Sequence, residues 1–215
     1  MKCAQNVLYR SYALNFKGCK GSRREKMILK GNFIYENIED LKKAIQEKNI
    51  KVEDEFITWD ISGQAIYVVA DITEKEIVMV RKFVLKDPKC RKSSKFDLIE
   101  WLNEEYAASL DESLKEMMIA PQGQQLIDLP REIEVFGKNE WGVTEEGSRW
   151  EYFKKLNNRI CGTGDDAEYS EWWWMNTPRR ASAARFCFCD SFGGATYTVA
   201  SDASRYVRPR FILAK

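Results

Sequence analysis

The chain has 215 residues, of which 44% are hydrophobic and 13% aromatic, so it can bury a full core and is not a disordered protein. Lys and Arg number 34 against 33 Asp and Glu, and the resulting charge of +1 excludes a global attraction to nucleic acid or to a membrane surface. The chain contains no histidine, which excludes a Ser-His-Asp or Cys-His nucleophile.

The first 50 residues read as an N-terminal appendage. Residues 1–30 contain the basic run "KGCKGSRREK" and little periodicity, so we interpret them as a solvated arm, with nucleic-acid contact as the alternative. Asn37 then precedes Ile38, Leu41 and Ile45 at helical spacing, which predicts a short capped helix. The start of the chain lacks the apolar centre of a secretion signal, and we expect a cytoplasmic or virion-associated protein without a membrane span.

Residues 51–215 are predicted to form the main domain, beginning with β-structure. From Glu55 to Leu85, β-branched and aromatic residues are separated by two short polar turns, which predicts a three-stranded meander. A helix capped by Ser94 should follow in "SKFDLIEWLNEEYAASL", and "DESLKEMMI" is expected to continue as a further helical piece.

Two shorter helices are predicted in the next part of the chain. "LPREIEVFG" has the proline of a first helical turn at Pro130 and a terminating glycine at Gly137. A third helix should cover Ser148 to about Asn158, because Trp150, Phe153 and Leu156 recur at helical spacing. The acidic turn after it, "CGTGDD", lacks the ligand spacing of a calcium loop, and we interpret it as solvated.

From Glu171 onward the pattern is typical of strands and turns. Three adjacent tryptophans in "EWWWMNTP" cannot all enter one core, because successive strand side chains point to opposite faces. Alternation in "SAARFCFCD" assigns Phe186 and Phe188 to one face, and Arg185, Cys187 and Cys189 to the other. We expect the first face to be core and the second to be displayed. A soft-metal site of the two cysteines with Cys161 is the alternative to small apolar residues, and we predict no metal.

The motifs "FDLIEWLNEEY", "IDLPREIEVFG", "EWWWMNTP" and "YVRPRFIL", in this order, resemble a bacterial and phage domain family of unknown function marked by a "WLN" helix, a "WWLRSP" strand and a terminal "GVRPAL" strand. The resemblance covers about Glu55 to Lys215. It departs from the family pattern where Met175-Asn176-Thr177 replaces Leu-Arg-Ser and where Tyr206 replaces a glycine. It implies an α+β, C-type-lectin-like fold with mixed antiparallel sheets and two main helices.

The same resemblance implies the position of a binding face. By family position, Trp173 and Trp174 are structural, whereas Trp172 is expected to point outward. The lectin-like fold would bring residues 172–206 onto one face as a variable region. We expect the ligand-binding residues there to be Trp172, Arg179, Arg180, Arg185, Cys187, Cys189, Phe192, Tyr197, Asp202, Arg205 and Tyr206. Tyr, Trp and Arg beside Ser, Gly and Asp are the mixture that antibody paratopes use.

The family includes or resembles variable proteins that retroelements diversify. The composition of Arg185 to Tyr206 is consistent with such randomised codons. The leading hypothesis is therefore a non-enzymatic protein that displays a diversifiable surface to a protein or cell-surface ligand, with no catalytic residue, cofactor or specific nucleic acid.

Two other hypotheses stay open. One is a phage or prophage tail-associated receptor-binding protein that uses the same face. The other is a formylglycine-generating type of oxidase, which shares a lectin-like fold and binds copper through cysteines, although "LPREIEVFG" keeps only the opening of its "LPTEAEWE" pattern.

Overall fold

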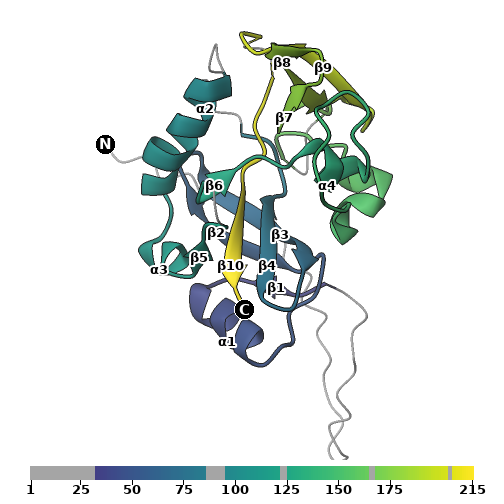
Figure 1. Ribbon diagram of the computed structural model, residues 1–215. Helices are drawn as coiled ribbons and strands as arrows, with labels where there is room; N and C mark the ends of the chain where they lie inside the picture. The colour runs from purple at the N-terminus through teal and green to yellow at the C-terminus, as the bar shows by residue number, and fades with distance from the viewer. Residues whose placement is uncertain (1–31, 86–94, 122–124, 165–167, 203–204) are drawn as a thin grey trace, which may run out of the picture. The chain divides into compact units, whose positions relative to one another are not determined.

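The computed structural model describes residues 32–85, 95–121, 125–164, 168–202 and 205–215, and residues 32–215 form one compact unit. The proposed basic arm, Ser94 and the acidic turn at 165–166 lie outside the described residues. The unit is a mixed α+β structure with two sheets (Figure 1).

The larger sheet is built mainly from the first part of the unit and closed by its last strand. Its order is β1-β2-β3-β4-β10-β5, and β6 also pairs with β10. The strands are β1 (Ile34–Tyr35), β2 (Glu55–Asp60), β3 (Gly63–Ile72), β4 (Glu76–Arg81), β5 (Met118–Ile119), β6 (Ile127–Asp128) and β10 (Arg210–Ala214). The antiparallel run β2-β3-β4 confirms the predicted meander, and β10 pairs antiparallel with β4 in the same sheet.

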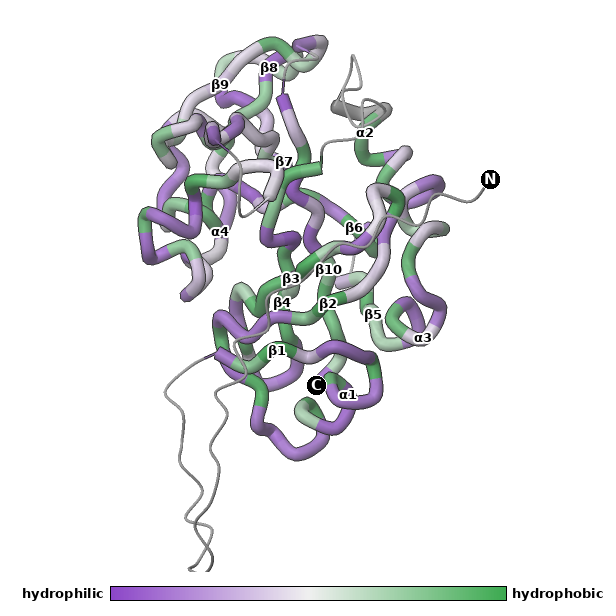
Figure 2. Tube along the Cα trace, turned by 180° about the vertical axis from the view of Figure 1, so that it is seen from behind, coloured by the Kyte–Doolittle hydropathy of each residue, from purple (hydrophilic) through white to green (hydrophobic). Residues whose placement is uncertain are grey.

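The central strands of this sheet are buried on both faces. One face of β3, β4 and β10 places Val69, Met79 and Phe211 in the main core cluster. The other face contributes residues such as Val80 and Ile212 to a second cluster. Figure 2 shows the corresponding hydrophobic colouring along these strands, in contrast to the hydrophilic α1. Burial on both sides explains why β4 reads as a continuous apolar run rather than as an alternating one.

Helix α1 (Ile38–Gln46) packs on this sheet. The Asn37 side chain accepts a hydrogen bond of 2.9 Å from the Asp40 amide, as predicted for the N-cap. Leu41 and Ile45 are buried in the main core, and β1 pairs with β2. Residues 32–50, which the sequence analysis places in an appendage, therefore belong to the same compact unit as the domain.

A helical segment follows the meander after a gap in the described residues. It comprises α2 (Lys95–Trp101), a π-helical turn η2 (Leu102–Tyr106) and α3 (Glu112–Lys115). Helix α4 (Glu132–Phe136) ends at Gly137, whose φ of 73° is the left-handed conformation expected of a terminating glycine. Pro130 precedes the N-cap residue Arg131 instead of lying in the first turn. None of the helices in the described part of the chain has the length and apolar character that crossing a bilayer requires.

The predicted third helix over 148–158 is wrong. The chain forms two 3-10 turns, η3 (Glu151–Lys154) and η4 (Leu156–Asn158), separated by Lys155 in an extended conformation. The hydrogen bonds here are not those of an α-helix: the Asn158 side chain donates to the Tyr152 carbonyl at 2.8 Å, and Arg208, from a distant part of the chain, donates to the Asn158 carbonyl at 2.8 Å. Leu156 is consequently 49% exposed, although its spacing predicts a core position.

The second sheet is antiparallel and consists of β7 (Trp173–Arg179), β8 (Ser182–Cys189) and β9 (Ala195–Val199) in that order. It lies in the upper part of the view in Figure 1, near α2 and away from α1. The segment before β10 connects the sheets, because the Trp174 amide donates to the Tyr206 carbonyl and the Leu85 amide to the Val207 carbonyl.

Candidate ligand-binding site

The three adjacent tryptophans occupy three different environments. Trp173 is fully buried in the second cluster, stacked on Phe153 at 5.9 Å, and its indole donates to the Arg159 carbonyl. Trp174 points the opposite way into the main core, edge-on to Phe188. Trp172 is 38% exposed. Trp173 and Trp174 are thus buried, as their predicted structural roles require, whereas Trp172 is partly exposed with its ring stacked on Phe188 at 5.3 Å.

Strand β8 is buried on both faces at its C-terminal end, which corrects the prediction for Cys187 and Cys189. Phe186 and Phe188 enter the main core as expected. Cys187 and Cys189, expected on the displayed face, are both 0% exposed within the second cluster. Gly142 lies beside Cys187, since a Cβ added to it would be at van der Waals distance, 3.4 Å, from the cysteine Sγ. Burial raises the pKa of both thiols well above its usual range.

The face of the second sheet that bears Cys187 is more accessible toward the β7–β8 turn. Four residues there form what we call the arginine–aromatic surface: Trp141, Arg179, Arg185 and Tyr197. The Tyr197 ring lies 4.0 Å from the Arg179 guanidinium carbon and 5.9 Å from that of Arg185. The Trp141 ring packs on the same tyrosine at 5.0 Å. Within the described residues neither of these two guanidinium groups has a hydrogen bond or an ion pair.

Trp141 is a surface residue that sequence reasoning missed. Its position depends on the buried carboxylate of Glu132 in α4, which accepts hydrogen bonds from the amides of Trp141 at 3.0 Å and Gly142 at 2.8 Å. The Trp141 indole donates to the Ala195 carbonyl in β9. No local pattern signals this role, because the loop is placed by a side chain nine positions earlier and by the second sheet.

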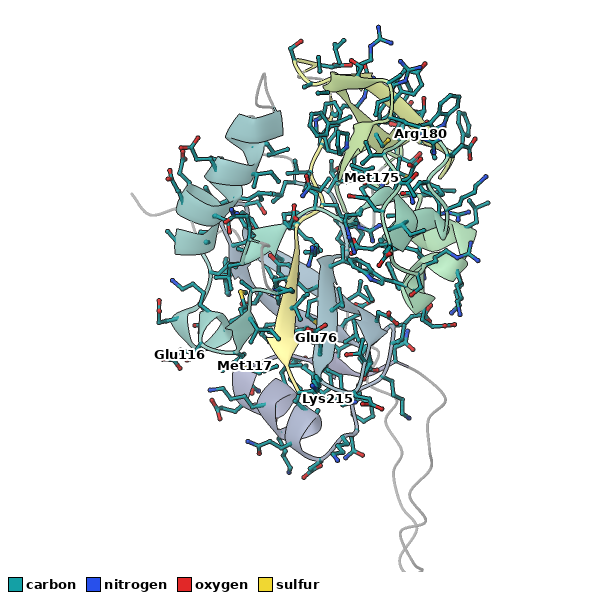
Figure 3. All side chains as sticks on the ribbon, viewed as in Figure 1. Glu76, Glu116, Met117, Met175, Arg180 and Lys215 are labelled. Atoms are coloured by element: carbon teal, nitrogen blue, oxygen red, sulfur yellow. The ribbon has the colours of Figure 1, made fainter. Side chains whose placement is uncertain are left out.

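Arg180, Phe192 and Tyr206 lie apart from this cluster in different ways. Arg180 is exposed at the β7–β8 turn, where it donates to the Asn139 carbonyl (Figure 3). Phe192 is 82% exposed in the β8–β9 turn, which Asp190 organises by accepting from the Phe192 and Gly194 amides. Tyr206 is half-buried against the second cluster.

A second group of predicted residues lies on the opposite face of the sheet. The Arg205 guanidinium lies 4.1 Å from the Trp172 ring and 4.5 Å from the Phe188 ring, and pairs with Asp202 at 3.0 Å. Arg205 is only 9% exposed, and burial lowers its pKa. The expected single face is therefore corrected: Arg179, Arg185 and Tyr197 share one side of the sheet, whereas Trp172, Asp202 and Arg205 are grouped on the other.

The described residues contain no group of three or more Cys, Asp or Glu side chains arranged to hold a metal ion. Glu132 and Glu145 lie near Cys187, but both oxygens of Glu132 and one oxygen of Glu145 already accept hydrogen bonds. Glu132 accepts the two amides described above, and Glu145 accepts a hydrogen bond of 2.9 Å from the Thr177 hydroxyl.

The part of the chain that contains the arginine–aromatic surface and the Arg205 group also occurs in other proteins. A family model described as a domain of unknown function, DUF6273, matches residues 92–215, more than half of the chain, and the chain therefore belongs to this family. The match begins after the meander, later than the resemblance placed from Glu55. No curated protein and no solved structure matches the chain.

Proposed function

We propose that this protein is a non-enzymatic ligand-binding protein of C-type-lectin-like fold whose arginine–aromatic surface binds an acidic group of a protein or cell-surface ligand. One observation carries the proposal. Arg179 and Arg185 both lie over the Tyr197 ring, and neither has an anionic partner among the described residues.

The chemistry of the surface favours an anion. A guanidinium stacked on an aromatic ring keeps its N–H donors directed outward in the plane that matches a carboxylate, sulfate or phosphate. Two such cations against the same ring repel each other, and a bound anion relieves that repulsion. Trp141 and Tyr197 add rigid apolar area beside the charges, as binding hot spots commonly do.

Two features support the finer assignment of a C-type-lectin-like fold. The last strand of the unit returns to pair with β4 of the first meander, so that early and late segments share one sheet. The segment between them forms a separate small antiparallel sheet. Such an arrangement presents the small sheet and its turns as a display surface on a fixed support.

The surroundings of the cysteines support a binding protein over a copper-dependent oxidase. Cys187 and Cys189 are buried, and their thiol pKa values are raised, whereas metal-ligating cysteines need the thiolate form.

Diversification by a retroelement is the finer part of the proposal, and the fold restricts where it could act. Within Arg185 to Tyr206, residues 186–189 are buried and would not tolerate random replacement. Variation should fall on the more accessible positions, including Arg185, Phe192 and Tyr197. A reverse-transcriptase gene beside a near-copy of the 3′ end of this gene would support diversification, and homologous copies varying mainly at 186–189 would contradict it.

The binding proposal is tested on glycan and peptide arrays that contain matched acidic and neutral members: sialylated, sulfated and neutral glycans, and Glu-containing and Gln-containing peptides. We expect the wild-type protein to bind acidic members and the Arg179→Gln/Arg185→Gln variant to lose at least about tenfold in affinity. The control, Lys42→Gln/Lys43→Gln on α1, removes the same charge at the other end of the view in Figure 1 and should bind as wild type. Equal binding by both double variants would contradict the proposal.

A further inference from the structure

A groove lies between the α2–η2 helix and the β7–β8 hairpin, on the opposite side of that hairpin from the arginine–aromatic surface. Its volume is about 700 Å³, within the range typical of ligand sites. The helix contributes Ile99, Glu100 and Glu104, and the hairpin contributes Asn176, Pro178 and Phe186. Figure 1 shows these two elements in the same upper part of the view.

Internal hydrogen bonds hold both walls of the groove in place. On the helix side, the side-chain NH2 of Asn103 donates to the backbone carbonyls of Ile99 at 2.9 Å and Ile127 at 2.8 Å. The side-chain oxygen of Asn103 accepts from the Ile127 backbone amide. On the hairpin side, Asn176 donates to the Asp128 carboxylate at 2.6 Å. Ile127 and Asp128 form β6, so one short strand supports both walls, and the groove is preformed.

The helix wall is negatively charged and unpaired. Glu100 and Glu104 are exposed, four positions apart, and enter the π-helical turn, where this separation approaches one full turn. Neither carboxylate makes a hydrogen bond or an ion pair with a described side chain. The lining contains no lysine or arginine. Repulsion between the two carboxylates disfavours this arrangement unless a cation lies between them.

The remaining lining selects the kind of cation. Phe186 is 4% exposed, and with Ile99 and Pro178 it gives the groove apolar surface that would suit an aliphatic stem. A hydrated metal ion gains nothing from such a surface, whereas an arginine side chain places its methylene groups on apolar residues and its guanidinium on carboxylates.

From this combination we propose that the groove is a second binding site, independent of the arginine–aromatic surface, and that it takes an arginine side chain of a peptide or protein partner. The guanidinium pairs with Glu100 and Glu104, and the stem and flanking apolar residues lie along Phe186 and Pro178.

The test uses the full chain, labelled with ¹⁵N, and two probes: acetyl-Leu-Arg-Leu-amide and the same peptide with citrulline, which replaces the guanidinium by a neutral urea of equal shape. NMR titration should show shifts at 99–104 and 176–186 with the arginine peptide, and binding at least about tenfold weaker with citrulline, as expected for a charge-assisted pair.

Two variants distinguish binding in the groove from a general electrostatic attraction between the protein and a cationic peptide. Glu100→Gln/Glu104→Gln should abolish the preference for arginine over citrulline. Glu116→Gln, an exposed glutamate after α3 in a different part of Figure 3, should retain it. Equal affinity for the two peptides, or an arginine preference that survives the double substitution, would overturn the proposal. So would concentration-dependent oligomers in analytical ultracentrifugation that the double substitution dissolves, because the occupant would then be a second copy of the chain. Loss of array binding by the Arg179→Gln/Arg185→Gln variant leaves these outcomes unchanged.

Discussion

The two sheets use arginine in opposite ways. In the larger sheet, Arg81 is buried and its guanidinium bonds to Asp60 at 2.8 Å, to Ser62 and to two backbone carbonyls. Arg208 likewise donates to the Arg81 and Asn158 carbonyls. In the second sheet, Arg179 and Arg185 contact the Tyr197 ring, and their guanidinium groups make no hydrogen bond or ion pair within the described part of the chain. The number of satisfied donors thus distinguishes a structural arginine from one available to a ligand, which residue type and sequence position do not.

The largest expected effect concerns β10, the strand that completes the larger sheet. Removing residues 210–215 deletes β10, which pairs with β4, β5 and β6 and buries Phe211 and Leu213. We expect no cooperative unfolding transition in circular dichroism, because both ladder bonds and core area are lost. A truncated protein with the wild-type melting curve would refute the role of β10.

Replacing Arg81 by methionine should cost about 3–5 kcal/mol, because it leaves Asp60 charged and buried without its cation. Equilibrium urea unfolding measures the loss. The double replacement Asp60→Asn/Arg81→Met is the matched control and should recover part of the stability. A cost below about 1 kcal/mol for Arg81→Met would show that this arginine is not structural.

Trp172 and Trp173 are adjacent in sequence but differ in burial. Trp173→Ala should cost about 3 kcal/mol or more, because it opens a cavity against Phe153. Trp172→Ala, one residue earlier and 38% exposed, should cost clearly less. Thermal unfolding of the two variants side by side tests the difference, and equal losses would contradict the assignment of strand faces.

Acid should weaken the larger sheet through Asp60. Burial raises the pKa of this carboxyl, but the charge of Arg81 and hydrogen bonds from Arg81 and Ser62 more than offset it, and the net pKa is lowered. Because the folded-state pKa is lowered, the ionised carboxylate stabilises the native state at pH values above the unfolded pKa of about 4. This contribution to the free energy of unfolding is lost as the pH falls through the folded-state pKa. Urea unfolding between pH 7 and pH 2 should show this decline, and constant stability down to pH 2 would exclude it.

The smallest expected effect lies on the second sheet. Arg185→Gln should change the free energy of unfolding by less than about 0.5 kcal/mol, because no described hydrogen bond or ion pair is lost. Urea unfolding in parallel with Arg81→Met gives the contrast directly. A loss near that of Arg81→Met would mean that Arg185 is structural and would remove the main support for the arginine–aromatic surface.

Local sequence patterns predicted where helices and strands begin and end better than they predicted which residues pack against them. Capping at Asn37, the stop at Gly137 and the alternation of the meander depend on neighbouring residues, so the sequence alone suffices for them. Alternation also separated Phe186 from Cys187 correctly, but it does not tell which side of a strand is covered. The loop that contains Gly142 covers Cys187 from a distant part of the chain. The predicted helix over 148–158 was wrong for the same reason, since the Asn158 side chain donates a hydrogen bond to Glu53, which is distant in sequence.

The pairing of β10 with β4 has a consequence for synthesis on the ribosome. Arg210 is aligned with Val80, so the gap between β4 and the short strands β5 and β6 stays open until the final segment of the unit has emerged from the exit tunnel. During translation β4 presents an unpaired apolar edge, the kind of surface that chaperones bind and that promotes aggregation. High contact order of this kind also predicts slow folding, and a delay between the emergence of β10 and the appearance of the native unit.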